Sequence, residues 1–163
     1  MEKSEPIDGA VMSGLEYLKA AFSTGETSAR GIDRTLCFRG VEAESGRVVF
    51  RAEPTEDHYN PVGIVQGGYS AALLDAVTGC AVHSVLPAGA RYATTDLRIT
   101  FLHPITKSSS PLRAEGALIH AGKKIALAEG SIFDAKGRLC ARGSATCMIM
   151  SPSHSEHIPD KAS

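Results

Sequence analysis

The chain has 163 residues, of which 43% are hydrophobic, and a formal net charge of −1 at pH 7. This length suits one domain with a substantial core. The balanced charge, the absence of a basic arm and the absence of tryptophan argue against nucleic acid as the main partner. We see no secretory signal pattern and no good membrane span, so we expect a cytoplasmic protein that binds no membrane.

Two segments carry apolar residues at helical spacing. The first covers residues 9–22, with Asp8 as its N-cap and Gly25 as its end. The second covers residues 67–86 and stops before Pro87. It is rich in alanine and leucine and almost entirely apolar, which predicts a buried helix.

Alternating apolar and polar residues predict six strands around these helices. The expected strands cover residues 32–42, 47–53, 92–105, 112–120, 125–134 and 139–150. The order of helix, two strands, long helix and four-strand meander predicts an α+β fold, not a parallel βαβ sheet. We expect one domain over residues 1–150 and a polar, disordered tail over residues 151–163.

The cysteines and histidines show no spacing typical of a metal site, so we predict that the protein uses no metal. Cys80 lies in the apolar helix, and Cys140 and Cys147 lie in strand-like segments. We expect all four cysteines, including Cys37, to be buried free thiols in a reducing compartment.

Asp75 is a lone carboxylate in the middle of the apolar helix, with no Lys or Arg within one helical turn. Burying an unpaired carboxylate is unfavourable, so we expect Asp75 to be functional. The alternative is that it only satisfies a backbone group or a hydroxyl. Its neighbours one turn away are small enough to let a bulky group reach it. They are Ala71, Ala72, Thr78 and Gly79.

Three further residues precede Asp75. Gly67 and Gly68 stand at the entrance of the helix, where backbone N–H groups lack intrahelical acceptors and can hold a developing negative charge. Asn60, in the preceding loop, offers an amide donor. Each is a weak signal alone, because Gly pairs and Asn-Pro commonly form turns. Together with Asp75 they indicate acyl-transfer or hydrolytic chemistry.

Residues 60–68, followed by Leu74, Asp75 and Gly79, resemble the hot-dog-fold thioesterases of the PaaI-like type. The resemblance covers roughly residues 30–150. Further similar segments are residues 94–104, 122–126 and 137–141.

This resemblance implies a hot-dog fold, in which a curved antiparallel sheet wraps a central helix, and assembly into dimers or tetramers. It also implies hydrolysis of acyl-CoA at sites shared between subunits, without a cofactor, because coenzyme A is part of the substrate. By position, Asp75 matches the catalytic carboxylate, as general base or nucleophile. Gly67 matches the oxyanion donor, Asn60 a side chain near the thioester, and Thr94 a hydroxyl that positions water.

The remaining predicted site residues bind substrate. Gln66 stands where the family usually has histidine, and glutamine cannot act as an acid or base near neutral pH. We therefore expect Gln66 to support the site, beside substrate contacts from Gly68 and Gly79. Lys123 and Lys124 lie in a turn that the resemblance places near the coenzyme A phosphates.

Two other functions stay open. A hot-dog dehydratase or hydratase needs an acid/base histidine with a carboxylate. Gln66 speaks against this reading, although His58 is available in the loop. A non-catalytic acyl-CoA-binding protein would make Asp75 a structural relic.

Overall fold

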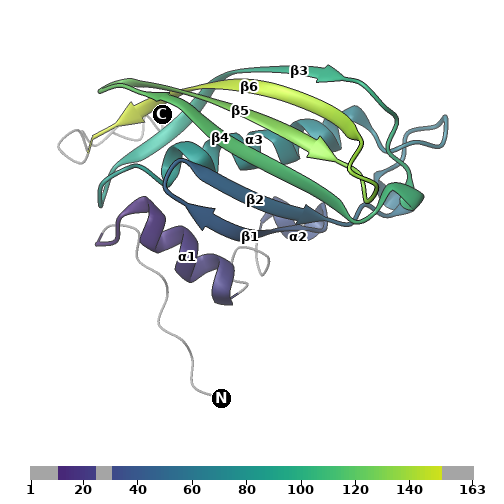
Figure 1. The fold of residues 1–163 in the computed structure, drawn as a ribbon, viewed down its shortest axis with the longest axis horizontal. Coiled ribbons are helices and arrows are strands. Elements are labelled where there is room, and N and C mark those ends of the chain that lie inside the picture. Colours follow the sequence, from purple (N-terminus) through teal and green to yellow (C-terminus); the bar gives the residue numbers. More distant parts are fainter. Residues whose placement is uncertain (1–10, 25–30, 152–163) are drawn as a thin grey trace, which may run out of the picture.

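The structure, a computed structural model, describes residues 11–24 and 31–151. A six-stranded sheet curves around one long helix, α3 (Gly67–His83), while helix α1 (Gly14–Thr24) lies outside the sheet (Figure 1). The predicted α+β arrangement with an extra N-terminal helix is therefore confirmed. Within the described residues, no helix is long and apolar enough to cross a membrane.

All neighbouring strands of the sheet are antiparallel, in the order β1-β2-β4-β5-β6-β3. Their bounds are β1 (Phe38–Glu44), β2 (Arg47–Ala52), β3 (Arg91–Phe101), β4 (Leu112–Ala121), β5 (Ile125–Phe133) and β6 (Leu139–Met150). After β2 the chain leaves the sheet, runs through α3 and returns as β3 at the opposite edge. The sheet therefore has two edge strands, β1 and β3.

A row of three glycines lets α3 lie close against the sheet. Gly116 on β4 pairs with Gly130 on β5, which pairs with Gly143 on β6. A Cβ atom on Gly116 would collide with the carbonyl of Val77, and one on Gly130 would come within 3.0 Å of Leu74. The absence of side chains on three neighbouring strands thus sets the position of α3, and with it the position of Asp75.

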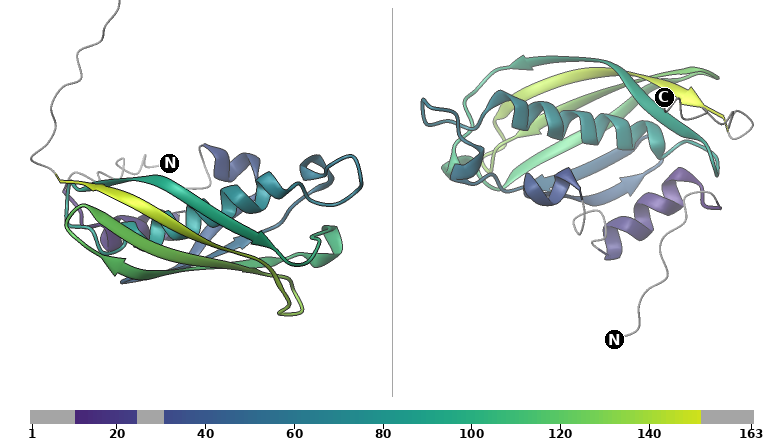
Figure 2. Two further views of the ribbon diagram at one scale, coloured as in Figure 1. Left: turned by 90° about the horizontal axis from the view of Figure 1, so that it is seen from above. Right: turned by 180° about the vertical axis from the view of Figure 1, so that it is seen from behind.

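The two sheet edges differ in what lies beside them. Helix α1 packs against β1, where the Phe22 ring lies over Gly40 and meets Phe50 edge-on at 5.3 Å. The short helix α2 (Ile32–Thr35) also contacts β1. Both helices lie on the β1 side in Figure 2, and no described element covers the outer edge of β3.

The N-terminal part differs from the sequence-based expectation in two places. Residues 32–37 are not a strand: they form α2 and a turn at Cys37, whose φ of 53° is left-handed and cannot continue into a strand. The first helix begins at Gly14, because Ser13 and Glu16 form a capping box there. The expected caps Asp8 and Gly25 lie outside the described residues.

Two smaller boundaries also differ. Helix α3 ends at His83 instead of residue 86, and β3 ends at Phe101 instead of residue 105. In the described part of the chain, the loops contain two short 3₁₀ helices that we did not predict, η2 (Glu56–His58) and η3 (Lys107–Ser109). The expected tail lies outside the described residues from position 152 onward.

Candidate active site

The N-terminus of α3 presents free backbone donors. Gln66 is the N-cap, its side chain makes no capping hydrogen bond, and its own N–H donates to the His58 carbonyl at 2.8 Å. The first bonded amide after it is Tyr69, which donates to the Gln66 carbonyl at 2.9 Å. The N–H groups of Gly67 and Gly68 therefore remain available to an oxyanion.

Gly67 has a second reason to be glycine. A Cβ atom there would lie 3.2 Å from the ring of Phe101, at the end of β3. This ring closes one side of the helix entrance. The Gly67 N–H consequently lies beside an apolar wall, where a hydrogen bond to a charged oxygen is stronger than in water.

Asn60 is oriented by its own loop. Its side-chain oxygen accepts hydrogen bonds from the N–H groups of Val62 at 3.1 Å and Ile64 at 3.2 Å. The oxygen end of the amide is therefore engaged by the loop, which leaves Nδ2 as a donor. This is the end of Asn60 that a carbonyl oxygen needs.

Asn60 and Gly67 line one cavity of about 300 Å³. The two predicted donors are thus brought together, as expected from their proximity in sequence. Other side chains of the same cavity are Ile64, Ser70, Phe101, His103 and Ile105.

Asp75 lies elsewhere on α3 and is exposed in the single chain, so the expectation of a buried carboxylate was wrong. Its side chain leaves the core because Leu73, Leu74 and Val77 occupy the face of the helix toward the sheet. The carboxylate nevertheless has a partner. Thr94 on β3 donates a hydrogen bond of 2.8 Å to its Oδ1.

The two pairs of predicted catalytic residues are separated within one chain. Asp75 follows Gly67 by eight residues of helix, which is about 12 Å along the helix axis. One thioester carbonyl cannot contact both residues of the same subunit. The predicted residues therefore form two groups, which we call half-sites: Asn60 with Gly67, and Asp75 with Thr94.

The thiols near Asp75 are unreactive. Burial, together with the smaller effect of the nearby carboxylates of Asp33 and Asp75, raises the pKa of Cys80 to about 12. Burial also raises the pKa of Cys147, whose Sγ lies 4.0 Å from the Thr94 hydroxyl. Neither thiol competes with Asp75 as a nucleophile at neutral pH. Cys37 is exposed and Cys80 is half-buried, so the prediction of four buried cysteines is confirmed only for Cys140 and Cys147.

The predicted substrate-binding residues are spread over the chain. Gln66 and Gly68 are exposed at the entrance of α3. Gly79 is buried beneath Tyr92, whose hydroxyl would collide with any Cβ at that position. In the single chain Gly79 therefore accommodates a tyrosine ring. Its contact with substrate stays a prediction.

Lys123 and Lys124 lie far from the Gly67 cavity of their own chain. Both are exposed in the turn between β4 and β5, where the Lys124 carbonyl accepts a hydrogen bond from Ile149 at 2.8 Å. Ile149 is near the end of β6, whereas Cys140 at its start lines the cavity. A role of these lysines in one site with Gly67 would need a second subunit.

Two polar residues of the cavity were missed by sequence reasoning. His103 donates from Nδ1 to the Leu139 carbonyl at 2.8 Å, which leaves Nε2 unengaged. Ser70 lies three residues after Gly67, on the same face of α3. This spacing was visible in the sequence for Ser70. The position of His103 beside the cavity was not visible in the sequence, because it depends on the path of the loop after β3.

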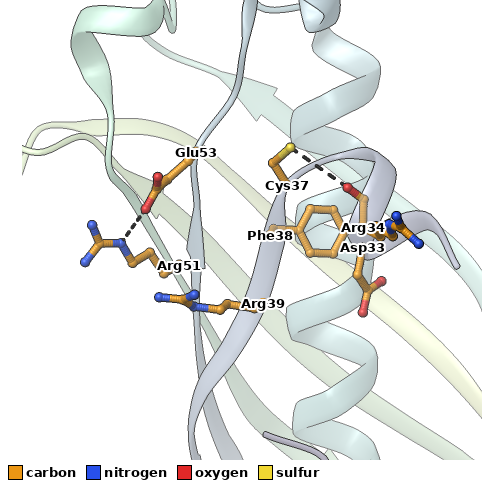
Figure 3. A pocket seen from close by; sticks show the side chains of 7 residues that line it. All are labelled: Asp33, Arg34, Cys37, Phe38, Arg39, Arg51 and Glu53. Atoms are coloured by element: carbon orange, nitrogen blue, oxygen red, sulfur yellow. Dashed lines mark hydrogen bonds and ion pairs between the residues drawn. The ribbon is translucent and has the colours of Figure 1, made fainter. Parts of the chain in front are cut away.

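A second cavity, of about 270 Å³, contains none of the predicted site residues. It lies between α2 and the β1–β2 edge, with Arg34, Arg39 and Arg51 around it (Figure 3). Arg51 donates to Glu53 at 2.9 Å, so part of this positive charge is neutralised locally.

Residues 62–141 match the family described as the thioesterase superfamily. A protein of Halobacterium salinarum, provisionally named as an esterase, is 33% identical over 105 residues, which cover 60% of this chain and 68% of that protein. The chain belongs to the thioesterase superfamily. Human acyl-coenzyme A thioesterase 13 is 29% identical over 119 residues, covering 72% of this chain and 84% of the human protein.

Solved structures show that this superfamily member has the hot-dog fold. A thioesterase from Haemophilus influenzae superimposes with a TM-score of 0.76 at 19% identity, covering 88% of this chain and 94% of the other. The PaaI protein of the phenylacetic acid degradation operon of E. coli gives a TM-score of 0.72 at 17% identity, with coverages of 84% and 96%. Superfamily membership makes thioester hydrolysis the expected class of reaction.

Proposed function

We propose that this protein hydrolyses acyl-CoA thioesters to a free acid and coenzyme A. The thioester carbonyl oxygen accepts hydrogen bonds from the Gly67 N–H and from Nδ2 of Asn60. When the carbonyl carbon becomes tetrahedral, negative charge develops on this oxygen, and the N-terminal end of α3 stabilises it. One preorganised donor of this kind contributes about 10²–10³-fold to kcat.

The attacking group is supplied by the second half-site. Asp75 either takes a proton from a water molecule that attacks the carbonyl carbon, or attacks this carbon itself. In both routes the C–S bond breaks, and coenzyme A leaves as a thiolate that then takes up a proton. In the second route this step leaves the acyl group on Asp75 as a mixed anhydride, which one water molecule hydrolyses to release the free acid and restore the carboxylate. The Thr94 hydroxyl holds Oδ1 of Asp75, so that Oδ2 is free to face the reaction.

The observation that carries the proposal is the separation of the two half-sites, because it requires a second subunit. Two β3 strands that pair antiparallel about a two-fold axis near Leu97 bring the start of one strand beside the end of the other. The partner subunit's Thr94 then lies next to Phe101, which lines the cavity with Gly67. The partner subunit's Asp75 accompanies its Thr94 and completes the site.

The sheet supports this assembly. Strand β3 has 11 residues and is an edge strand whose outer side is uncovered among the described residues. A long free edge promotes aggregation unless another strand pairs with it. A dimer, or a tetramer of two such dimers, removes this hazard. The four cysteines are free, which fits the cytoplasmic location that we propose.

A second candidate is a hydratase or dehydratase, which needs an available histidine in the site. His58 is not available for it, because Thr55 N–H donates to its Nδ1 at 2.9 Å and its Nε2 donates to the Thr35 carbonyl at 3.0 Å. His103 is available, since it lines the cavity with Nε2 unengaged. Hydrolysis is the better-supported reaction, because superfamily membership and the oxyanion donors both point to it.

The deciding experiment is a screen of aryl- and alkyl-CoA thioesters in which a thiol-reactive dye detects free coenzyme A. We expect a kcat/KM of at least about 10⁴ M⁻¹ s⁻¹ for one class of acyl group. An enoyl-CoA in the same screen, followed by loss of its ultraviolet absorbance without release of thiol, detects the hydratase. No thiol release from any thioester contradicts the proposed function.

A further inference from the structure

Two serines at the two ends of α3 are equally buried but differ in their bonding. Ser70 and Ser84 are each 4% exposed. The Ser84 hydroxyl accepts a hydrogen bond from Gly46 N–H at 2.8 Å and donates one to the Ala81 carbonyl at 2.7 Å. The Ser70 hydroxyl has no hydrogen-bond partner among the described residues. The Ser70 Oγ is not one of the fully enclosed polar atoms that lack a partner, so this hydroxyl reaches the cavity beside it and is free to bind a ligand there.

A structural serine in a helix has a simple way to satisfy its hydroxyl. It can donate to the backbone carbonyl four residues earlier. Thr78, on the same helix, does this: its hydroxyl donates to the Leu74 carbonyl at 2.8 Å. Ser70 makes no such bond back to its own helix. Its hydroxyl is therefore left for a group outside the helix.

The position of Ser70 indicates what that group is. Ser70 lines the cavity of about 300 Å³ that also contains Gly67 and Asn60. It lies on the same face of α3 as Gly67, three residues further on, which is about 4.5 Å along the helix axis. Phe101 and Ile105 supply an apolar wall to the same cavity. A polar group next to a bound thioester would thus meet the Ser70 hydroxyl inside an otherwise largely apolar space.

We infer that Ser70 is a further substrate-binding residue, which forms a hydrogen bond to a polar atom of the thioester substrate beside its carbonyl group. This inference rests on the proposed thioesterase function. Two parts of an acyl-CoA carry such an atom at suitable reach. One is an oxygen on carbon 3 of the acyl group, and the other is the first amide of the pantetheine arm.

The experiment compares Ser70→Ala with Ser84→Ala as a matched control. Three thioesters are used: the best acyl-CoA of the wild-type protein, its 3-hydroxyacyl derivative, and the same acyl group on ethanethiol, which lacks the amide. We expect Ser70→Ala to lower kcat/KM at least about 10-fold on one or more of them, the scale of one lost hydrogen bond. Its melting temperature should stay nearly the same, because the variant loses no hydrogen bond within the described part of the protein. Ser84→Ala should lower the melting temperature and leave kcat/KM unchanged.

The pattern of losses identifies the atom. A loss confined to the 3-hydroxyacyl derivative assigns Ser70 to the acyl group. A loss on both CoA thioesters that spares the ethyl thioester assigns it to the pantetheine amide. An equal loss on all three would place Ser70 on the thioester carbonyl itself and overturn the inference. Ser70→Ala activity within twofold of the wild type on all three substrates overturns the inference.

A binding measurement separates this inference from the proposed function. A non-hydrolysable acyl-CoA analogue, with a methylene group between the sulfur and the carbonyl, is titrated calorimetrically into both variants. If the wild-type protein binds the analogue but hydrolyses no thioester, the proposed function fails. Ser70 is then judged by Kd alone: we expect Ser70→Ala to weaken binding about 10-fold, and an unchanged Kd overturns its role.

Discussion

Thr94 and Asp75 lie 19 positions apart in the chain, and the Thr94 hydroxyl donates a 2.8 Å hydrogen bond to Oδ1 of Asp75. This bond joins the middle of α3 to the edge strand β3. It holds an exposed carboxylate in one orientation at the margin where a second subunit can approach. An exposed aspartate without such a partner would sample several rotamers.

Asp75→Asn should abolish most of the activity. The asparagine keeps the size of the side chain and can still accept the hydrogen bond from Thr94, but it has no carboxylate to act as base or nucleophile. We expect hydrolysis to fall by at least about 100-fold. Because Asp75 is exposed, the melting temperature should change little. Normal turnover by a well-folded Asp75→Asn protein would falsify the mechanism.

Thr94→Val should lower kcat by about 10-fold while KM changes little, because the carboxylate loses the hydroxyl that orients it. Thr95→Val is the matched control. Its hydroxyl donates to the Thr146 carbonyl at 3.1 Å instead of to Asp75. Steady-state kinetics on both variants should show a loss in the first and none in the second. Equal effects in both would mean that only the strand was disturbed.

Sharing of the site between subunits can be tested by complementation. Asn60→Ala and Asp75→Asn should each be inactive as pure proteins. A heterodimer of the two contains one site in which both original residues meet. If co-expression gives random pairing, half of the dimers are heterodimers with one intact site of two, so about a quarter of the wild-type activity should return. No recovery in verified heterodimers, or a stable monomer by sedimentation at micromolar concentration, would contradict the shared site.

Gln66→His should be tolerated. Gln66 is exposed and its side chain makes no capping hydrogen bond, so an imidazole can replace it without loss of a contact. We expect kcat/KM to stay within a few-fold of the wild-type value, and Gln66→Ala to cause only a modest loss. Inactivity of a folded Gln66→His protein would reveal a specific role for the glutamine amide.

Asp134 should stabilise the turn between β5 and β6 in a pH-dependent way. Its carboxylate accepts hydrogen bonds from the N–H groups of Lys136 and Arg138, both at 2.9 Å, and the Arg138 N–H lowers its pKa most. A lowered folded-state pKa gives stability that is present above the ordinary value of 3.8 and is lost as pH falls through the lowered value. Asp134→Ala should therefore melt several degrees below the wild type at pH 7. This difference should shrink below pH 3.8, and a pH-independent difference would contradict the assignment.

The sequence predicted the main elements because their patterns are local. Strands β2, β4, β5 and β6 appear within one or two residues of their expected ranges, since alternation reports which side of a sheet each residue faces. Helix α3 begins where the glycine pair predicted it. Residues 32–37 were misassigned, because the left-handed turn at Cys37 leaves no signal in the apolar pattern.

The sequence by itself determined which groups are available for chemistry: a side-chain amide at Asn60, a free backbone N–H at Gly67 and a carboxylate at Asp75. Only the tertiary structure decided how they are grouped. Packing of α3 on its glycine row turns Asp75 outward to Thr94 and turns Ser70 toward the Asn60 cavity. The side of a helix that meets a sheet depends on contacts between distant segments, and no local pattern encodes those contacts.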